Sequence, residues 1–151
     1  MPFATSIAPT WSRQFLKQIV DSLRTPPVAG PLTGAFLKLF SAVTGPISPD
    51  LGVGDFTEAT FTGYAQVSIA SVLGPTVNSP SGEGLMQQGD GDFVATAGVV
   101  SETILGYYVV DNTLAQVIMS ELFLTPLGVN IPGDFISLDA CFGLNFQNQI
   151  A

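Results

Sequence analysis

The sequence predicts a mainly β fold: an antiparallel β-sandwich, a jelly-roll-like fold or a barrel of about seven or eight strands, with one N-terminal amphipathic helix. Strand-like stretches follow one another with no helical pattern between them, which argues against parallel βαβ units. Sixteen glycines and eleven prolines among 151 residues supply turns between these stretches. A helical spacing of apolar residues occurs near the N-terminus.

The predicted helix covers residues 11–24 and follows Thr10, a suitable N-cap. Apolar residues at helical spacing form one face, and the basic residues fall mostly on the other. Two consecutive prolines end the helix. We therefore divide the chain into an N-terminal arm with its helix, residues 1–27, and a β domain, residues 28–151. The apolar stripe consists of Trp11, Phe15, Leu16, Ile19, Val20 and Leu23.

The β domain begins with a strand near residue 35, and residues 64–72 show the clearest alternation of apolar and polar positions. Residues 103–110 and 115–124 are predicted to form a hairpin, because the residues between them favour a turn. Loops are expected at residues 45–54, 74–84 and 126–133. The predicted strands are Ala35–Phe40, Tyr64–Val72, Leu85–Gln88, Asp92–Ala97, Thr103–Val110, Ala115–Leu124 and Asp134–Leu144.

The composition indicates a protein that is covered by partner subunits. Hydrophobic residues make up 46% of the chain and charged residues 11%, whereas a typical globular domain carries about 25% charged residues. Interface cores are depleted in charge. The low charge therefore favours binding to other protein subunits, including copies of the chain itself.

The charges are also unevenly distributed. The first 40 residues hold all four Lys and Arg and one Asp, a net charge of +3, whereas residues 41–151 hold seven Asp and four Glu, a net charge of −11. Nucleic acid phosphates are bound mainly through Lys and Arg, so the acidic body argues against nucleic acid as a partner. The basic segment is either a contact for an acidic partner surface or an ordinary solvated helix face.

Few residues are suited to catalysis. The chain has no histidine and one cysteine, Cys141, which removes the commonest general base and the usual zinc ligands. No glycine-rich phosphate-binding motif is present. We therefore predict no catalytic residues, no cofactor and no enzymatic activity. The enzyme alternative rests on carboxylate pairs, Asp90 with Asp92 or Glu102 with Asp111, acting as acid and base.

Asp90 and Asp92 alternate with glycines and invite comparison with a calcium loop. The segment lacks the full EF-hand pattern, so a solvated turn is the preferred interpretation and no metal site is predicted. No secretory signal and no apolar run of membrane-spanning length are found, so no membrane partner is expected. The predicted partner-contact residues lie on the N-terminal helix. They are Trp11, Arg13, Phe15, Lys17 and Arg24.

Several stretches together resemble a group of small structural proteins of tailed bacteriophages, including phages of cyanobacteria. They are Phe36–Phe40, Asp55–Ala65, Ile104–Asp111, Met119–Phe123 and Gly133–Leu138. The resemblance covers roughly residues 35–144 and consists of turn and strand patterns without catalytic chemistry; it does not include the predicted helix.

The resemblance implies a virion protein, and within that group the best match is a capsid cement or decoration protein. Such proteins are typically β-rich trimers on the capsid exterior that clamp neighbouring major capsid protein subunits. The expected partners are therefore the major capsid protein and further copies of the chain. The alternatives are a tail, fibre or head-completion protein, and a carbohydrate-binding jelly-roll module for host attachment.

Overall fold

The computed structural model describes residues 10–12, 34–69, 77–78, 84–98 and 100–145. Within these residues the chain forms nine strands and a short 3-10 helix, η1. The elements are β1 (Thr10–Trp11), β2 (Ala35–Val43), η1 (Val53–Asp55), β3 (Phe56–Glu58), β4 (Val67–Ser68), β5 (Val77–Asn78), β6 (Gly84–Val94), β7 (Glu102–Asp111), β8 (Gln116–Val129) and β9 (Phe135–Asn145).

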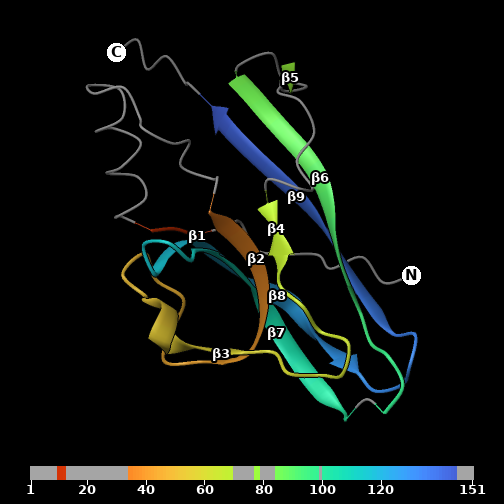
Figure 1. Cartoon of the computed structure of the whole chain (residues 1–151). Coiled ribbons are helices and arrows are strands. Elements are labelled where there is room, and N and C mark those ends of the chain that lie inside the picture. Colours follow the sequence, from red (N-terminus) through yellow and green to blue (C-terminus); the bar gives the residue numbers. More distant parts are fainter. Residues whose placement is uncertain (1–9, 13–33, 70–76, 79–83, 99, 146–151) are drawn as a thin grey trace.

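The strands form two antiparallel sheets. The larger sheet has six strands in the order β1-β8-β7-β2-β3, with β4 also paired to β2, and the smaller sheet has the order β5-β6-β9. Figure 1 shows β6 and β9 as a long two-stranded ribbon that runs past β2, β7 and β8. The predicted mainly β, antiparallel fold is confirmed, but neither sheet closes into a barrel within the described residues.

The main hydrophobic core contains residues of both sheets. Leu37 and Leu39 of β2 belong to the same buried cluster as Phe93 of β6 and Leu138 of β9. The backbone of β6 comes very close to the Leu37 side chain of β2, since a Cβ atom added at Gly91 would lie 2.6 Å from Cδ2 of Leu37. A glycine at this position therefore permits the two sheets to share one core.

A second buried cluster lies on the other face of β2 and β7. Phe40, Phe56 and Tyr108 form its centre. The Phe56 and Tyr108 rings stack with their centroids 4.6 Å apart, and the Phe40 ring meets Phe56 edge-on at 5.1 Å. Apolar residues of the β2–β3 connection, including Ile47 and Leu51, pack against this cluster. Both faces of the larger sheet are thus apolar near β2 and β7, in keeping with the low charge of the sequence.

Several predicted boundaries differ from the structure, and three of the differences have a clear physical reason. Residues 64–66 lie outside any strand. The Tyr64 hydroxyl oxygen instead accepts a hydrogen bond from the backbone N–H of Leu39 in β2. Residues 84–94 form one strand because each of them pairs with a residue of β9, so no turn interrupts the sequence at residues 89–92. Strand β8 continues through Pro126 to Val129; its register with β7 shifts between Leu122 and Leu127, and a proline is tolerated at such an irregularity.

The N-terminal prediction needs one correction. Thr10 and Trp11 form β1, which pairs with Ser120 and Met119 of β8, so Trp11 does not begin a helix. Backbone pairing with a free sheet edge outweighs the helical spacing of the side chains here. Residues 13–24, which make up the rest of the predicted helix, lie outside the described residues. Part of the predicted arm is therefore built into the β domain.

Candidate interaction surface

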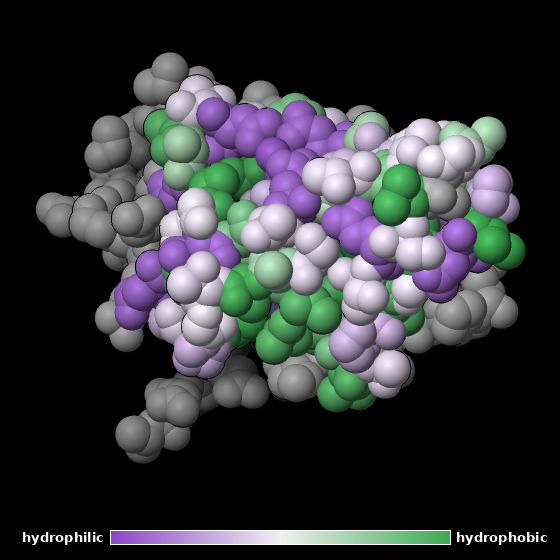
Figure 2. Space-filling model, turned by 90° about the horizontal axis from the view of Figure 1, so that it is seen from below, coloured by the Kyte–Doolittle hydropathy of each residue, from purple (hydrophilic) through white to green (hydrophobic). Residues whose placement is uncertain are grey.

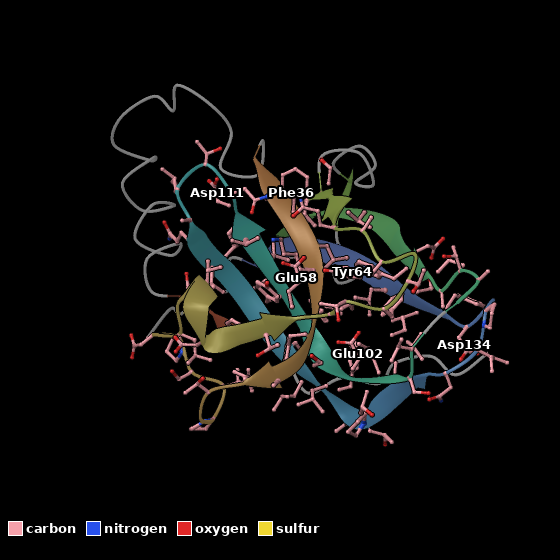
Figure 3. All side chains as sticks on the ribbon, turned by 60° about the horizontal axis from the view of Figure 1, so that its bottom comes forward. Phe36, Glu58, Tyr64, Glu102, Asp111 and Asp134 are labelled. Carbon is pink, nitrogen blue, oxygen red and sulfur yellow. The ribbon has the colours of Figure 1, made fainter. Side chains whose placement is uncertain are left out.

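A polar network joins β2, β3 and the connection between β3 and β4. The Lys38 ammonium group lies 3.0 Å from Oε2 of Glu58, and the Tyr64 hydroxyl donates to Oε1 of the same carboxylate at 2.9 Å. The backbone N–H of Leu39 donates to the Tyr64 oxygen at 3.2 Å. Figure 3 shows Glu58 and Tyr64 near one another over β2. The Tyr64 ring also stacks on Phe93, with centroids 5.7 Å apart, so the network links both sheets.

The surroundings of this network keep its phenol groups protonated. Burial raises the pKa of Tyr64 far above its ordinary value, and the nearby negative charge of Glu58 adds to the rise. Burial likewise raises the pKa of Tyr108. Both phenols therefore stay protonated at neutral pH, and Tyr64 acts as a fixed hydrogen-bond donor. No sequence motif connects these residues, since Lys38 and Glu58 are 20 positions apart.

Four of the described carboxylates accept hydrogen bonds from backbone groups of turns and loops. Glu102 accepts from the backbone N–H of Thr60 at 2.8 Å, and Asp111 accepts from that of Thr113 at 2.8 Å. In the same way, Asp55 accepts from the backbone of Gly52 at 2.8 Å. These side chains satisfy backbone donors, which is a common task of acidic residues in turns.

The candidate acid–base pair Glu102 and Asp111 is separated by the fold. The two residues occupy opposite ends of β7, as Figure 3 shows. Nine residue steps along a strand correspond to about 30 Å. Paired carboxylates in glycosidases lie only about 5–9.5 Å apart. Glu102 and Asp111 therefore cannot act together on one bond.

Asp90 and Asp92 lie within the continuous strand β6, where Asp90 pairs in register with Asp139 and Asp92 with Ser137. The predicted turn around Asp90 is thus wrong, and a calcium loop of the kind considered from the sequence does not form there. Among the described residues, no group of three or more His, Cys, Asp or Glu side chains is arranged to hold a metal ion.

Glu121 is a buried acidic residue, and the neighbouring sequence does not predict its burial. Its side chain is buried, and the Tyr107 hydroxyl donates to one of its carboxylate oxygens, Oε2. The other oxygen, Oε1, is buried and has no hydrogen-bond partner. Burying such a group costs free energy. Glu121 sits in an apolar strand pattern, so no signal in the sequence identifies it in advance.

Asp134 caps the turn between β8 and β9 and makes that turn sensitive to acid. Its Oδ2 atom accepts from the backbone N–H groups of Asn130 and Ile131 at 2.8 and 3.1 Å, and these bonds lower the pKa of Asp134 below its ordinary value of 3.8. The stabilisation is therefore present above the unfolded-state pKa and is lost as the pH falls through the lowered one.

We expect Asp134→Asn to remove this acid-dependent contribution while leaving the fold intact. NMR titration of the side-chain carboxyl carbons should show an Asp134 midpoint below that of an unstructured Asp. The free energy of unfolding of Asp134→Asn should then fall less steeply between pH 5 and pH 3, a range set around ordinary Asp values, than that of the unsubstituted protein. An ordinary midpoint for Asp134 would contradict the capping role.

Of the five predicted partner-contact residues, the structure places one. Trp11 lies in β1 opposite Met119, whereas Arg13, Phe15, Lys17 and Arg24 lie outside the described residues. The structure does locate the two ends of the basic segment. The backbone N–H of Ser12 donates to Ile118 at 2.8 Å, and the carbonyl oxygen of Gly34 accepts from Asn112 at 3.1 Å. Ser12 and Gly34, the described residues on either side of residues 13–33, thus both lie beside the β7–β8 turn.

Exposed apolar side chains lie on the smaller sheet. Val94 of β6 and Phe135 of β9 pair directly in register, and they are 48% and 40% exposed. Ile131 in the adjoining turn is also exposed. Figure 2 shows hydrophobic residues gathered in several places among hydrophilic ones on one face of the molecule. Apolar side chains that stay next to each other on a surface are suited to a protein contact.

Comparison with known proteins found no matching family model, no matching curated protein and no matching solved structure. No helix in the described part of the chain combines the length and apolar character needed to cross a membrane.

Proposed function

We propose that this protein is a non-enzymatic virion component of a tailed bacteriophage, a cement protein on the capsid exterior that binds neighbouring major capsid protein subunits. The observation that carries the proposal is the attachment of the basic segment. Residues 13–33 contain three of the four basic residues and are joined to the β domain at Ser12 and Gly34, close to the β7–β8 turn. The basic residues of the sequence are thus concentrated in a segment whose two attachment points lie beside the β7–β8 turn of an acidic domain.

Further observations support a binding role. Glu102, Asp111 and Asp134 are hydrogen-bonded to backbone groups of turns and loops. The larger and smaller sheets share one core, which supports a sandwich-like arrangement for the proposed cement protein. A cement protein of this kind self-associates, and trimers are what the family resemblance implies. Many copies on one shell add their weak contacts through multivalency.

The test is the copy number of this chain relative to the major capsid protein in purified particles, measured by quantitative mass spectrometry. A ratio of one to one, or a simple fraction of it, supports a cement protein that covers the shell. A few copies per particle would instead indicate a tail, fibre or head-completion protein. Absence from particles would overturn the virion assignment and return attention to a carbohydrate-binding module.

The basic segment is best tested by charge rather than by deletion. Removing residues 1–24 would also remove β1 and its pairing with β8. The variant Arg13→Gln, Lys17→Gln, Arg24→Gln keeps β1 and removes three positive charges. We expect its affinity for capsids that lack the protein to fall about 3- to 150-fold in low salt, because three lost charge pairs of about 0.2–1 kcal/mol each sum to about 0.6–3 kcal/mol.

Co-sedimentation of the purified variant with such capsids measures this affinity, and circular dichroism checks that the fold is retained. Asp92→Asn serves as a control that changes the net charge at an exposed position of β6. This control should bind like the unsubstituted protein. Equal binding by the triple variant would show that the basic segment does not make the capsid contact.

A further inference from the structure

The outer face of the smaller sheet carries apolar side chains at positions where an exposed strand face is usually polar. On the inner face, Phe93 of β6 and Ile136 of β9 are buried in the shared core. By strand alternation Val94 and Phe135 point the opposite way, and they are 48% and 40% exposed. These two residues pair in register, so their side chains are neighbours. Together with Ile131, which is exposed in the turn that leads to Phe135, they make up the outer apolar patch.

Backbone contacts fix the chain around this patch. The backbone N–H of Ala95, which follows Val94, donates to the carbonyl oxygen of Asp134 at 2.8 Å, and the N–H of Gly133 donates to that of Ala95 at 2.9 Å. Gly63 packs against the same strand, since a Cβ atom added there would lie 2.5 Å from the carbonyl oxygen of Val94. A surface that is already ordered in this way loses little conformational entropy when it binds a partner.

The charged residues that border the patch are acidic. Asp92 precedes Val94 by two positions on β6, so its exposed side chain lies on the same face. Asp134 directly precedes Phe135, and the hydrogen bonds from its turn lower its pKa, so it is ionised at neutral pH. Residues 41–151 contain no Lys or Arg that could offset these charges. The patch is therefore an apolar surface with an acidic border.

We propose that the outer apolar patch binds a second protein whose contact surface carries apolar side chains flanked by Lys or Arg. Charge complementarity identifies this occupant, because opposite charges around an apolar contact speed association and exclude other partners. Nucleic acids and anionic membranes are repelled by an acidic border. The same patch of a second copy is disfavoured as well, since it would bring two acidic borders together.

The patch is separate from the attachment points of the basic segment. Glu102 pairs with Val129 at one end of β7, and the turn after Val129 leads to Phe135. Ser12 and Gly34 lie beside the β7–β8 turn, at the other end of β7. The inference therefore goes beyond the proposed capsid contact and does not depend on it.

Short synthetic peptides serve as probes of the partner chemistry. Calorimetric titration of the full chain with a peptide of alternating lysine and valine measures the affinity. Matched peptides replace the lysines by glutamates or the valines by serines. We expect the lysine–valine peptide to bind at least about tenfold more tightly than either matched peptide, because it alone offers both apolar and basic groups.

Matched variants locate the contact on the molecule. The double variant Val94→Ser, Phe135→Ser should bind the lysine–valine peptide about tenfold or more weakly, because it removes apolar area that the contact buries. The control Leu114→Ser, Leu124→Ser changes side chains that are 56% and 59% exposed elsewhere, and it should bind like the unsubstituted protein. Asp92→Asn should weaken binding about 1.4- to 5-fold in low salt and less in high salt. Circular dichroism checks that each variant keeps the fold.

NMR spectra of the unsubstituted protein give a measure that does not depend on how the variants fold. Addition of the lysine–valine peptide should shift the signals of Val94, Ile131 and Phe135 more than those of Leu114 and Leu124. Equal binding by the two double variants, or shift changes that avoid Val94 and Phe135, would overturn the inference.

Sedimentation of the full chain tests the remaining occupant. Self-association that the Val94→Ser, Phe135→Ser variant abolishes would show that a second copy covers the patch, and this result would also overturn the inference. None of these outcomes alters the copy number in virus particles, so a failure here can be told apart from a failure of the cement-protein proposal.

Discussion

Replacing Gly106 with alanine is expected to destabilise the protein by about 3 kcal/mol. A Cβ atom at this position would lie 2.1 Å from the backbone oxygen of Glu121 and 2.7 Å from Cζ of Phe40. The first of these atoms belongs to the neighbouring strand, so it cannot move aside as the end of a flexible side chain would. Overpacking of this kind typically costs about 1–3 kcal/mol and occasionally more.

Urea denaturation followed by circular dichroism measures this effect. Gly54→Ala is the matched control, since a Cβ atom added at Gly54 would meet no atom within 4 Å and its backbone has no positive φ. The control should change the free energy of unfolding by no more than about 0.5 kcal/mol. Equal midpoints for Gly106→Ala and Gly54→Ala would show that β7 and β8 are not packed as closely as described.

Truncating Phe40 to alanine is expected to lower the free energy of unfolding by about 3–5 kcal/mol. Phe40 is fully buried and packs edge-on against both Phe56 and Tyr108. The substitution leaves a cavity between the larger sheet and the β2–β3 connection. Domains of ordinary stability have about 5–15 kcal/mol in total, so the loss is a large share.

The same denaturation experiment includes Leu124→Ala as the control. Leu124 is 59% exposed in β8, and its truncation should cost less than about 0.5 kcal/mol. NMR spectra of Phe40→Ala should show the largest shift changes at Phe56 and Tyr108. A cost for Phe40→Ala similar to that of Leu124→Ala would mean that the second buried cluster contributes little to stability.

Local patterns predicted the parts of the fold that depend on neighbouring residues. The hairpin of β7 and β8 followed from two apolar stretches around turn residues, and Asp111 indeed caps that turn. The approximate position of β9 followed in the same way. The alternation of apolar and polar residues wrongly predicted a strand at residues 64–66. Tyr64 there makes a side-chain hydrogen bond with the backbone of β2, and its own backbone is not part of a strand.

Long-range pairing decided the remaining strand boundaries. Glycines at positions 89 and 91 indicate a turn when they are read locally, yet β9 pairs with every residue of β6 and keeps the strand continuous. The missing side chain of Gly91 leaves room for Leu37 of the other sheet, a residue 54 positions away in the chain. The β1–β8 pair similarly draws Trp11 into the sheet and away from the helix that its spacing predicts.

By itself the sequence determined the fold class, the scarcity of catalytic side chains and the separation of basic from acidic residues, because these depend on composition and short-range periodicity. Tertiary structure alone decided that Glu102 and Asp111 lie far apart, that Lys38, Glu58 and Tyr64 meet, and that Ser12 and Gly34 are hydrogen-bonded to Ile118 of β8 and to Asn112 of the β7–β8 turn. The physical reason is that strand pairing joins residues that are distant in the chain, and a local sequence pattern does not specify with which strand a given strand will pair.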